Sequence, residues 1–211
     1  MSKPLILIRH GSTKLNSEDR IRGWLNIPLD DEGKKQAVKT GRKLKKEKLD
    51  GIISSDLDRC IETSSIVSKL TGAPILDVTA HFRPWNVGYL TGAKTDEAHK
   101  ILAVFAQEKP NEKIKDGESF NDFKKRFLTG IEMVKKELPD KKIAICTHHR
   151  GDKIMAAWEA KGEPKDLEID LPTFLVDGIK PGDYRVEGEI KHEKGQEAEY
   201  KPIKKVLEKH K

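Results

Sequence analysis

The chain has 211 residues, 36% of them charged, with a formal net charge of +6 at pH 7 and a mean hydropathy of -0.67. No window approaches roughly 18 consecutive apolar residues, and the first strand signal leaves no room before it for a signal peptide, so we expect a soluble protein without a membrane partner. The lysines are interleaved with Asp and Glu and few aromatic residues accompany them, which indicates a solvated surface and argues against a nucleic-acid partner.

Cysteine usage indicates the compartment. Cys60 and Cys146 each lie in an apolar pattern, and they show no spacing typical of a metal or redox site. We therefore expect two buried free thiols in a reducing cytoplasm. The length suits a single domain, or one domain with an elaboration.

The first predicted element is a short buried strand. Residues 5–8 form a four-residue apolar run, Arg9 and His10 follow it, and Gly11 allows the backbone to turn. Ligands of open α/β sheets bind outside the carboxyl ends of the strands. An arginine there can recognise phosphate or carboxylate, and an imidazole can act as a nucleophile. The alternative is a strand that ends in two ordinary polar surface residues.

Strand and helix signals alternate along the rest of the chain, which predicts an α/β fold. Gly, Pro and Ser residues separate them, and Ser54-Ser55-Asp56 is expected to cap the second helix. The expected strands are 5–8, 49–54, 75–78 and 141–147, with one or two more within 167–192 around the turn at 180–183. The expected helices are 30–48, one from Leu57 to the glycine at 72, 95–107, 119–138, and one that follows 148–151 and runs to 160.

Three predicted strand ends carry the residues that point to chemistry. Arg9 and His10 follow the first strand, Arg59 lies in the helix turn after the second, and His148 follows the fourth. Two imidazoles and two arginines suit phosphoryl transfer, because a neutral histidine can attack phosphorus while the cations offset charge on its oxygens. We expect no metal and no cofactor. A zinc site is the rival interpretation, but the arginines would repel the ion and no HxH or HExxH spacing occurs.

These motifs resemble the histidine phosphatase, or phosphoglycerate mutase-like, superfamily. Its opening Arg-His-Gly motif is similar to residues 9–11, its second signature to 54–63, and its final motif to Thr147-His148. Residues 23–37 and 117–119 are similar to further blocks, so the resemblance covers roughly residues 5–160.

The resemblance implies a fold and a domain plan. We expect one domain over residues 1–211, a three-layer α/β sandwich with a mostly parallel central sheet flanked by helices. A small helical cap insertion, about residues 80–118, should lie over the crevice. Residues 193–211 should form a charged C-terminal extension.

The resemblance also implies residue roles. His10 would be the phosphorylated nucleophile, and Arg9, Arg59 and His148 would hold the phosphoryl oxygens. Substrate-binding roles are expected for Asn16, Arg22, Arg83 and His149. Many relatives have glutamine at the position of Arg22. Many have glycine at the position of His149, and the alternative for His149 is an ordinary structural histidine at the surface. His81, His99, His192 and His210 have no motif support.

One position departs from the family pattern. Many relatives carry a general-acid glutamate in the block that resembles residues 82–92, and Pro84 stands at its place here. Proline has no proton to give. Either another residue such as His81 or His149 protonates the leaving group, or the substrate has a leaving group that needs no acid, or the chain only binds a phosphorylated ligand.

The expected function is therefore that of a cofactor-free phosphatase. It would hydrolyse phosphomonoesters or other phosphoryl compounds with good leaving groups through phospho-His10. Its partner would be a small phosphorylated substrate or a phosphoprotein, and inorganic phosphate would be the product. A non-catalytic phosphate-binding member is the alternative. A phosphoglycerate-type mutase is less favoured, because the glutamate is missing and the chain is short.

Overall fold

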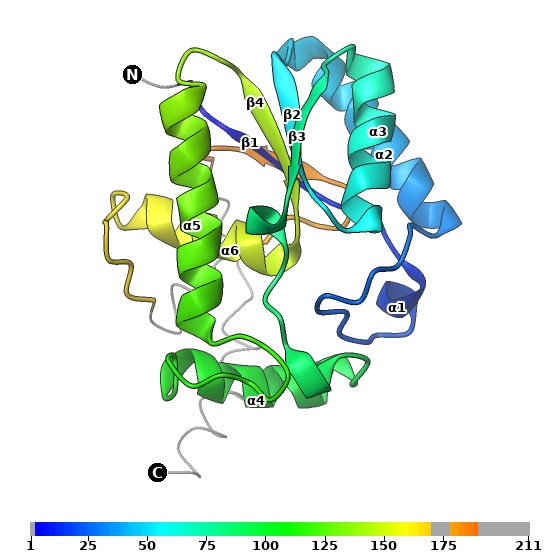
Figure 1. The fold of residues 1–211 in the computed structure, drawn as a ribbon. Helices are drawn as coiled ribbons and strands as arrows, with labels where there is room; N and C mark the ends of the chain where they lie inside the picture. The colour runs from blue at the N-terminus through cyan, green and yellow to red at the C-terminus, as the bar shows by residue number, and fades with distance from the viewer. Residues whose placement is uncertain (1–2, 170–177, 190–211) are drawn as a thin grey trace.

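A five-stranded sheet lies at the centre of the structure, a computed structural model that describes residues 3–169 and 178–189 (Figure 1). Its strand order is β3-β2-β4-β1-β5. The first four run parallel, and β5 pairs antiparallel with β1. The mostly parallel α/β sheet confirms the expected fold class. The strands are β1 (Ile6–Arg9), β2 (Gly51–Ser55), β3 (Ile75–Thr79), β4 (Ile143–Thr147) and β5 (Tyr184–Val186).

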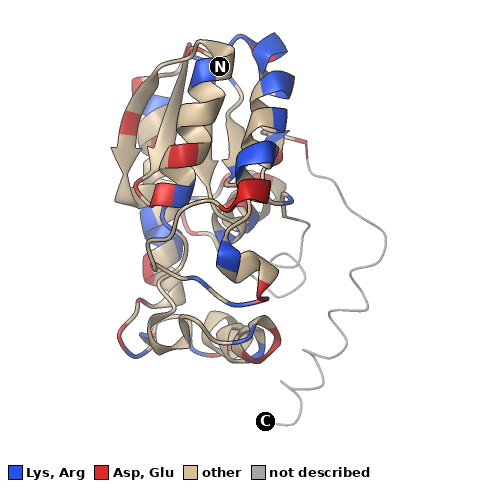
Figure 2. Ribbon diagram, turned by 90° about the vertical axis from the view of Figure 1, so that its right-hand side faces the viewer, with Lys and Arg blue, Asp and Glu red and all other residues tan. Residues whose placement is uncertain are grey.

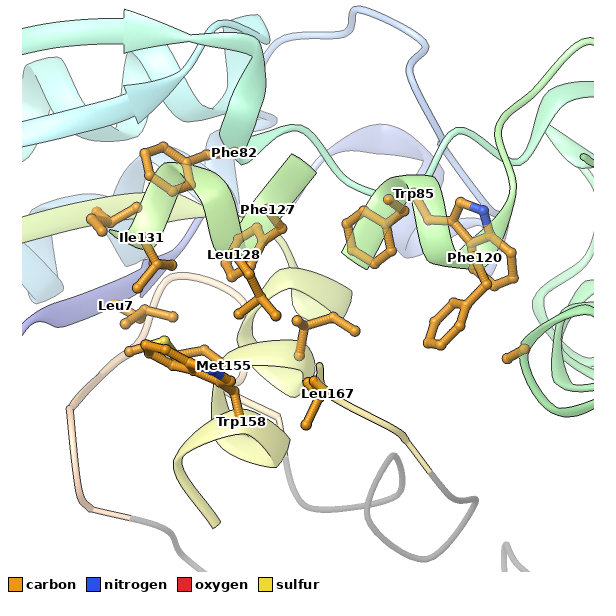
Figure 3. Packing of buried hydrophobic residues seen from close by; sticks show 14 of the residues in the cluster. Leu7, Phe82, Trp85, Phe120, Phe127, Leu128, Ile131, Met155, Trp158 and Leu167 are labelled. Carbon is orange, nitrogen blue, oxygen red and sulfur yellow. The ribbon is translucent and has the colours of Figure 1, made fainter. Parts of the chain in front are cut away.

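Helices cover both faces of the sheet and complete three layers (Figure 1). Successive side chains of a strand point to opposite faces, so Leu5 and Leu7 enter one core cluster while Ile6 and Ile8 enter another. The larger cluster packs against α5 and α6, and Figure 3 shows its aromatic and aliphatic side chains close together. The smaller one packs against α2 and α3. These helices are α2 (Asp31–Leu44), α3 (Asp58–Thr71), α5 (Phe120–Glu137) and α6 (His149–Ala160).

The expected cap segment lies beyond the carboxyl ends of the parallel strands, at the lower end of Figure 1. It follows β3 and precedes α5 in the chain. A single-turn helix after β1 lies near the same end. The cap segment contains the 3₁₀ turns η2 (Ala80–Phe82) and η3 (Gly88–Leu90) and the helix α4 (Thr95–Gln107), and the single turn is α1 (Lys14–Ser17).

Most predicted elements are confirmed within a few residues, with three differences. The helix expected over 30–48 ends earlier, and its last turn is the 3₁₀ helix η1 (Lys45–Glu47). The expected serine cap is wrong, because Ser54 and Ser55 belong to β2 and Leu57 occupies the N-cap of α3 without a side-chain cap. Of the strands expected within 167–192, β5 is seen, while residues 170–177 and 190–192, like the extension 193–211, lie outside the described residues.

The surface fits its composition. Both signs of charge occur over the surface in Figure 2, but Lys and Arg gather along α2, whose acidic residues lie only in its first turn, so the expected interleaving does not hold on this helix. Cys60 and Cys146 are free and buried, as expected. Among the described residues, no helix is long and apolar enough to cross a membrane.

Candidate active site

The neighbouring strands β2, β4 and β1 end side by side and bring the predicted residues together. His10 directly follows β1, His148 follows β4 as the N-cap of α6, and Arg59 lies in the first turn of α3 after β2. The imidazole rings of His10 and His148 lie 5.0 Å apart between centroids. Residues separated by nearly 140 positions thus form one cluster because parallel strands end at the same edge.

His10 is held as a neutral imidazole with one free nitrogen. Its Nδ1 lies 2.7 Å from the carbonyl oxygen of Gly11, which can only accept, so Nδ1 carries the proton and Nε2 carries the lone pair. The residue is only 1% exposed. Burial holds the pKa of His10 well below its ordinary value, and the charges of Arg59 and Arg22 add to this. A neutral Nε2 is the form that can attack phosphorus.

Arg59 is fixed by three acceptors. Its Nη1 donates to Leu25 O at 2.8 Å and its Nη2 to Gly23 O at 3.0 Å, while Nε donates to Nδ1 of His148 at 3.3 Å. Each terminal nitrogen keeps one further N–H, because guanidinium has five donors. Arg59 can therefore bind an oxyanion with a preorganised fork.

His148 is also neutral, with the opposite tautomer. Because Arg59 donates to its Nδ1, the proton lies on Nε2, which is 3.0 Å from Ser55 Oγ. The pKa of His148 lies well below its ordinary value, mainly because the ring is buried and next because Arg59 is charged. Two neighbouring neutral histidines thus coexist among cations without mutual repulsion.

Arg9 is partly engaged by the protein. Its Nη1 donates to Ile179 O at 2.8 Å and to Nδ1 of His149 at 3.1 Å. Its buried Nε has no hydrogen-bond partner among the described residues. Burial lowers the pKa of Arg9 to about 10, against the opposing effect of Asp152. The pairing with Arg9 places the His149 proton on Nε2.

A cavity of about 40 Å³ lies within this cluster. No described residue that lines it is Asp or Glu. Burial lowers the pKa of Arg22 to about 9 and that of Arg150 to about 10, and nearby arginines add to both shifts. The cavity is therefore strongly positive. The residues that line it are His10, Ile21, Arg22, Gly23, Arg59, Pro84, Trp85, His148, His149 and Arg150.

Two residues expected to bind substrate are engaged elsewhere. Asn16 accepts from the backbone and hydroxyl of Thr13 through Oδ1, which caps α1. Arg83 forms a bidentate ion pair with Asp56, at 2.7 and 2.6 Å, and stacks over the ring of Trp24. Neither Asn16 nor Arg83 lines the cavity, and Arg9 reaches it only through its contact with His149, so the binding roles of all three stay predictions.

Arg150 is a cavity residue that sequence reasoning did not single out. It lies two residues after His148, at the start of α6. Residues at helix N-termini near strand ends face the crevice of such sheets, and this was the signal available. Trp85 also lines the cavity, beside Pro84.

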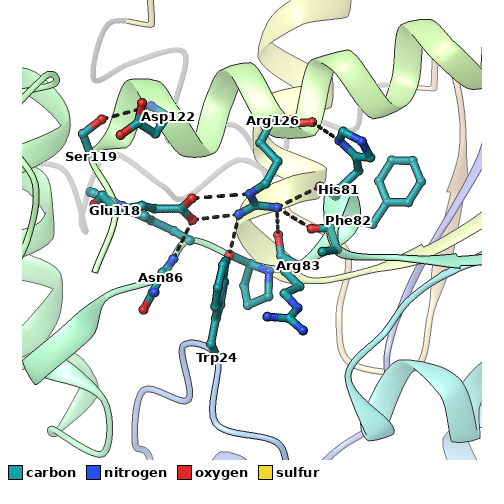
Figure 4. A network of polar contacts seen from close by, with 12 residues as sticks. Trp24, His81, Phe82, Arg83, Asn86, Glu118, Ser119, Asp122 and Arg126 are labelled. Carbon is teal, nitrogen blue, oxygen red and sulfur yellow. Dashed lines mark hydrogen bonds and ion pairs between the residues drawn. The ribbon is translucent and has the colours of Figure 1, made fainter. Parts of the chain in front are cut away.

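A polar network around Arg126, Glu118 and Trp24 (Figure 4) holds the backbone near Pro84. The carbonyl oxygen of Pro84 accepts from Trp24 Nε1 at 2.8 Å and from Arg126 Nη2 at 3.1 Å. Arg126 also pairs with Glu118 at 2.7 Å, and Glu118 accepts from the backbone N–H of Asn86. This carboxylate is therefore committed to structure and does not line the cavity.

The donors of the site do not resemble a metal centre. Among residues 3–169 and 178–189, no group of three or more His, Cys, Asp or Glu side chains could hold a metal ion. The cations that surround His10 and His148 would oppose a further positive charge. The arrangement suits an anion.

The fold and site define a class that comparison with known families confirms. The model of the histidine phosphatase superfamily (branch 1) matches residues 5–171, and the chain belongs to this superfamily. It is similar to phosphoglycerate mutase-like protein 4 of Arabidopsis thaliana, with 29% identity over 200 residues, 89% of this chain and 86% of that protein. It is also similar to the metal-independent phosphoserine phosphatase of Arabidopsis thaliana, with 30% identity over 150 residues, 68% of this chain and 63% of that protein.

Solved structures share the fold. The mycobacterial glucosyl-3-phosphoglycerate phosphatase in complex with VO3 superposes with a TM-score of 0.72 at 21% identity, over 92% of this chain and 100% of that chain. The complex of that protein with inorganic phosphate superposes with a TM-score of 0.70 at 22% identity, over 88% of this chain and 89% of that chain. At these identities the likeness concerns the fold.

Proposed function

We propose that this protein is a metal-independent phosphatase that works through a phosphohistidine on His10. The observation that carries the proposal is the neutral His10, with its lone pair on Nε2, in a cavity lined by arginines and free of described carboxylates. A phosphoryl dianion is the group that such a cavity favours. The superfamily and its phosphatase members support the same reaction class.

The reaction has two displacements. His10 Nε2 attacks phosphorus, an N–P bond forms, and the bond between phosphorus and the leaving-group oxygen breaks with its electron pair on that oxygen. Water then attacks phosphorus, the N–P bond breaks, and inorganic phosphate leaves with neutral His10 restored. Arg9 and Arg59 offer their remaining N–H groups to the phosphoryl oxygens in both steps, and their positive charge stabilises the charge on these oxygens in the transition state. His148 contributes by orienting Arg59, because it accepts from Arg59 Nε.

None of the described residues that line the cavity is a strong acid for the leaving group. Pro84 lines the cavity and has no proton to give. His149 also lines it, but burial and then the charge of Arg9 hold its pKa well below the ordinary value, so it is a neutral hydrogen-bond donor and not an imidazolium. His81 binds Arg126 O through Nδ1 and does not line the cavity. We therefore expect substrates whose leaving groups depart without a proton.

A series of phosphate monoesters graded by leaving-group pKa tests this function. We expect turnover of nitrophenyl phosphate in the presence of EDTA, a steep negative dependence of kcat/KM on leaving-group pKa, and alkyl phosphates slower by about 10²–10⁴. His10→Ala should lose turnover. The exposed Arg42→Gln variant serves as a control and should keep it.

Three results would contradict the proposal. Binding of phosphate with no turnover of any ester would indicate a non-catalytic phosphate-binding protein. Loss of activity on chelation, restored by zinc or magnesium, would indicate a metal enzyme. Equal rates for sugar phosphates and nitrophenyl phosphate, with phosphorylation rate-limiting for both, would show that a general acid is present.

A further inference from the structure

The cavity carries more positive charge than one phosphoryl group balances. Among the described residues, the arginines Arg22, Arg59 and Arg150 line it, and a fourth, Arg9, contacts His149 of its lining. Asp152 acts electrostatically on Arg9, but its carboxylate is paired with Arg185 at 2.5 Å. A phosphoryl dianion offsets two of the four charges, and the buried histidines stay neutral.

Two of these guanidiniums are not engaged by the described protein. Arg59 is fixed by backbone carbonyls and His148, and Arg9 by Ile179 O and His149. Arg22 and Arg150, by contrast, form no hydrogen bond or ion pair through their side chains with any residue that the structure describes. Both line the cavity and are partly buried. Desolvated cations in this position gain most from an anion that reaches them.

Arg150 also occupies an electrostatically unfavourable place. It lies in the first turn of α6, where the helix dipole and the free N–H groups already favour negative charge. A cation there raises the local positive potential. An arginine at this place is suited to an anionic ligand. It is not the N-cap residue of α6, which is His148.

Arg22 and Arg150 differ in what they act on. Arg59, Arg22 and Arg9 are the charges that act most strongly on His10. Arg150 instead acts on Arg22 and on His149. Arg22 and Arg150 both line the cavity, and the charge of Arg150 acts on Arg22, so one anionic group between them can offset both charges.

We propose that Arg22 and Arg150 bind a second anionic group of the substrate, a carboxylate or another phosphate carried by the leaving group. The inference rests on the proposed function, because it takes the first anionic group to be the phosphoryl group bound next to His10. It names the substrate class as phosphoryl compounds that carry two anionic groups. The polar N–H of His149 Nε2 can donate to the same second group.

Binding of non-hydrolysable phosphonates, measured by calorimetry, tests the subsite without turnover. The probes are 3-phosphonopropionate, its neutral carboxamide, ethylphosphonate, and ethane-1,2-bisphosphonate. We expect 3-phosphonopropionate to bind wild-type protein about tenfold or more tightly than its carboxamide, the scale of a charge-assisted hydrogen bond. The bisphosphonate distinguishes a phosphate-selective subsite from a carboxylate-selective one.

Substitutions assign the preference to the two arginines. Arg150→Gln and Arg22→Gln should each bring the ratio of the two affinities close to one, and Arg150→Lys should retain part of it. Arg42→Gln removes the same charge from the exposed face of α2 and should leave the ratio unchanged. Thermal unfolding of each variant checks that it folds.

The outcomes separate the two proposals. No anionic preference in wild type, or a preference retained in both glutamine variants, overturns the subsite, while turnover of nitrophenyl phosphate would still uphold the phosphatase. An equal loss of preference in Arg42→Gln overturns it too, because the effect would then be long-range charge. A clear preference that needs Arg22 and Arg150, in a protein that turns over no ester, upholds the subsite and contradicts the phosphatase.

Discussion

Arg59 shows how single side chains are positioned in this site. Its guanidinium is held by the carbonyl groups of Gly23 and Leu25 and by His148, so its direction is set before any ligand binds. Preorganised donors stabilise a transition state without the cost of reorganisation. A flexible cation at the same place would have neither the fork nor the anchors.

Arg59→Lys should therefore be a poor enzyme although the charge is kept. We expect kcat/KM for nitrophenyl phosphate to fall, and the ratio to wild type should correspond to a loss of about 2–4 kcal/mol of transition-state stabilisation. Steady-state kinetics measures it. Arg42→Lys is the matched control, because Arg42 is exposed on α2. Normal kcat/KM in Arg59→Lys would remove Arg59 from the phosphoryl site.

The site residues differ in how far the sequence reveals them. His10, Arg59 and His148 follow apolar strands or start helices, so their convergence could be predicted from the rule that ligands bind at the carboxyl ends of parallel strands. The ion pair of Arg83 could not, because it depends on how a loop after β3 meets Asp56 after β2.

Elements with a clear hydrophobic period are predictable, and short turns are not. The phenylalanines of α5 recur at helical spacing and are buried, and Ser119 caps that helix by accepting from Asp122 N–H as expected. The single turn α1 and the 3₁₀ turns have no such period. Their conformation depends on contacts with distant segments, such as the hydrogen bond that Tyr89 N–H in η3 donates to Lys115 O.

The loop that carries Pro84 depends on one side chain of α5. Arg126 donates to the carbonyl groups of Ala80, His81, Arg83 and Pro84 and pairs with Glu118 (Figure 4). The side chains of this ion pair are 18% and 15% exposed. Its loss would leave a largely buried carboxylate and four backbone acceptors without this donor.

Arg126→Gln should lower both stability and activity. We expect the free energy of unfolding in urea to fall by about 3 kcal/mol, the lower end for a broken buried ion pair. Because Pro84 lines the cavity, kcat/KM should fall as well. Lys125→Gln, an exposed neighbour on α5, should change neither, and an Arg126→Gln protein with wild-type stability would show that the network does not hold the loop.

On the scale of the molecule, the surface carries both signs of charge, with a basic run along α2 (Figure 2). Among the described residues, the cavity instead concentrates arginines around neutral histidines. The fold holds this cluster together at the ends of β1, β2 and β4. The apo protein should therefore be sensitive to acid, because protonation would add charge to a buried positive cluster.

The free energy of unfolding should fall as the pH drops below about 6.5. The pKa values of His10 and His148 are held well below that value in the folded protein, first by burial, so only the unfolded chain takes up these protons. Their contribution is fully present above pH 6.5 and is lost as the pH falls, by about 1.4 kcal/mol per pH unit for each histidine.

His10→Ala isolates one of these two contributions. The test measures the free energy of unfolding in urea between about pH 6 and pH 5. Its slope against pH should be smaller in His10→Ala than in wild type by about 1.4 kcal/mol per pH unit, which corresponds to one proton fewer taken up on unfolding. Added phosphate should stabilise the wild-type protein across this range, since it binds the folded state. An unchanged slope in His10→Ala would mean that His10 titrates normally in the folded protein.

The central claim is that His10 carries the phosphoryl group between substrate and water. The most direct measurement is to mix the protein with nitrophenyl phosphate labelled with radioactive phosphorus, stop the reaction in alkaline denaturant, and map the labelled peptide. The account predicts an acid-labile, alkali-stable label on His10 that forms at least as fast as kcat, and no label in His10→Ala. A burst of nitrophenol without a labelled protein, or a label on any other residue, would contradict it.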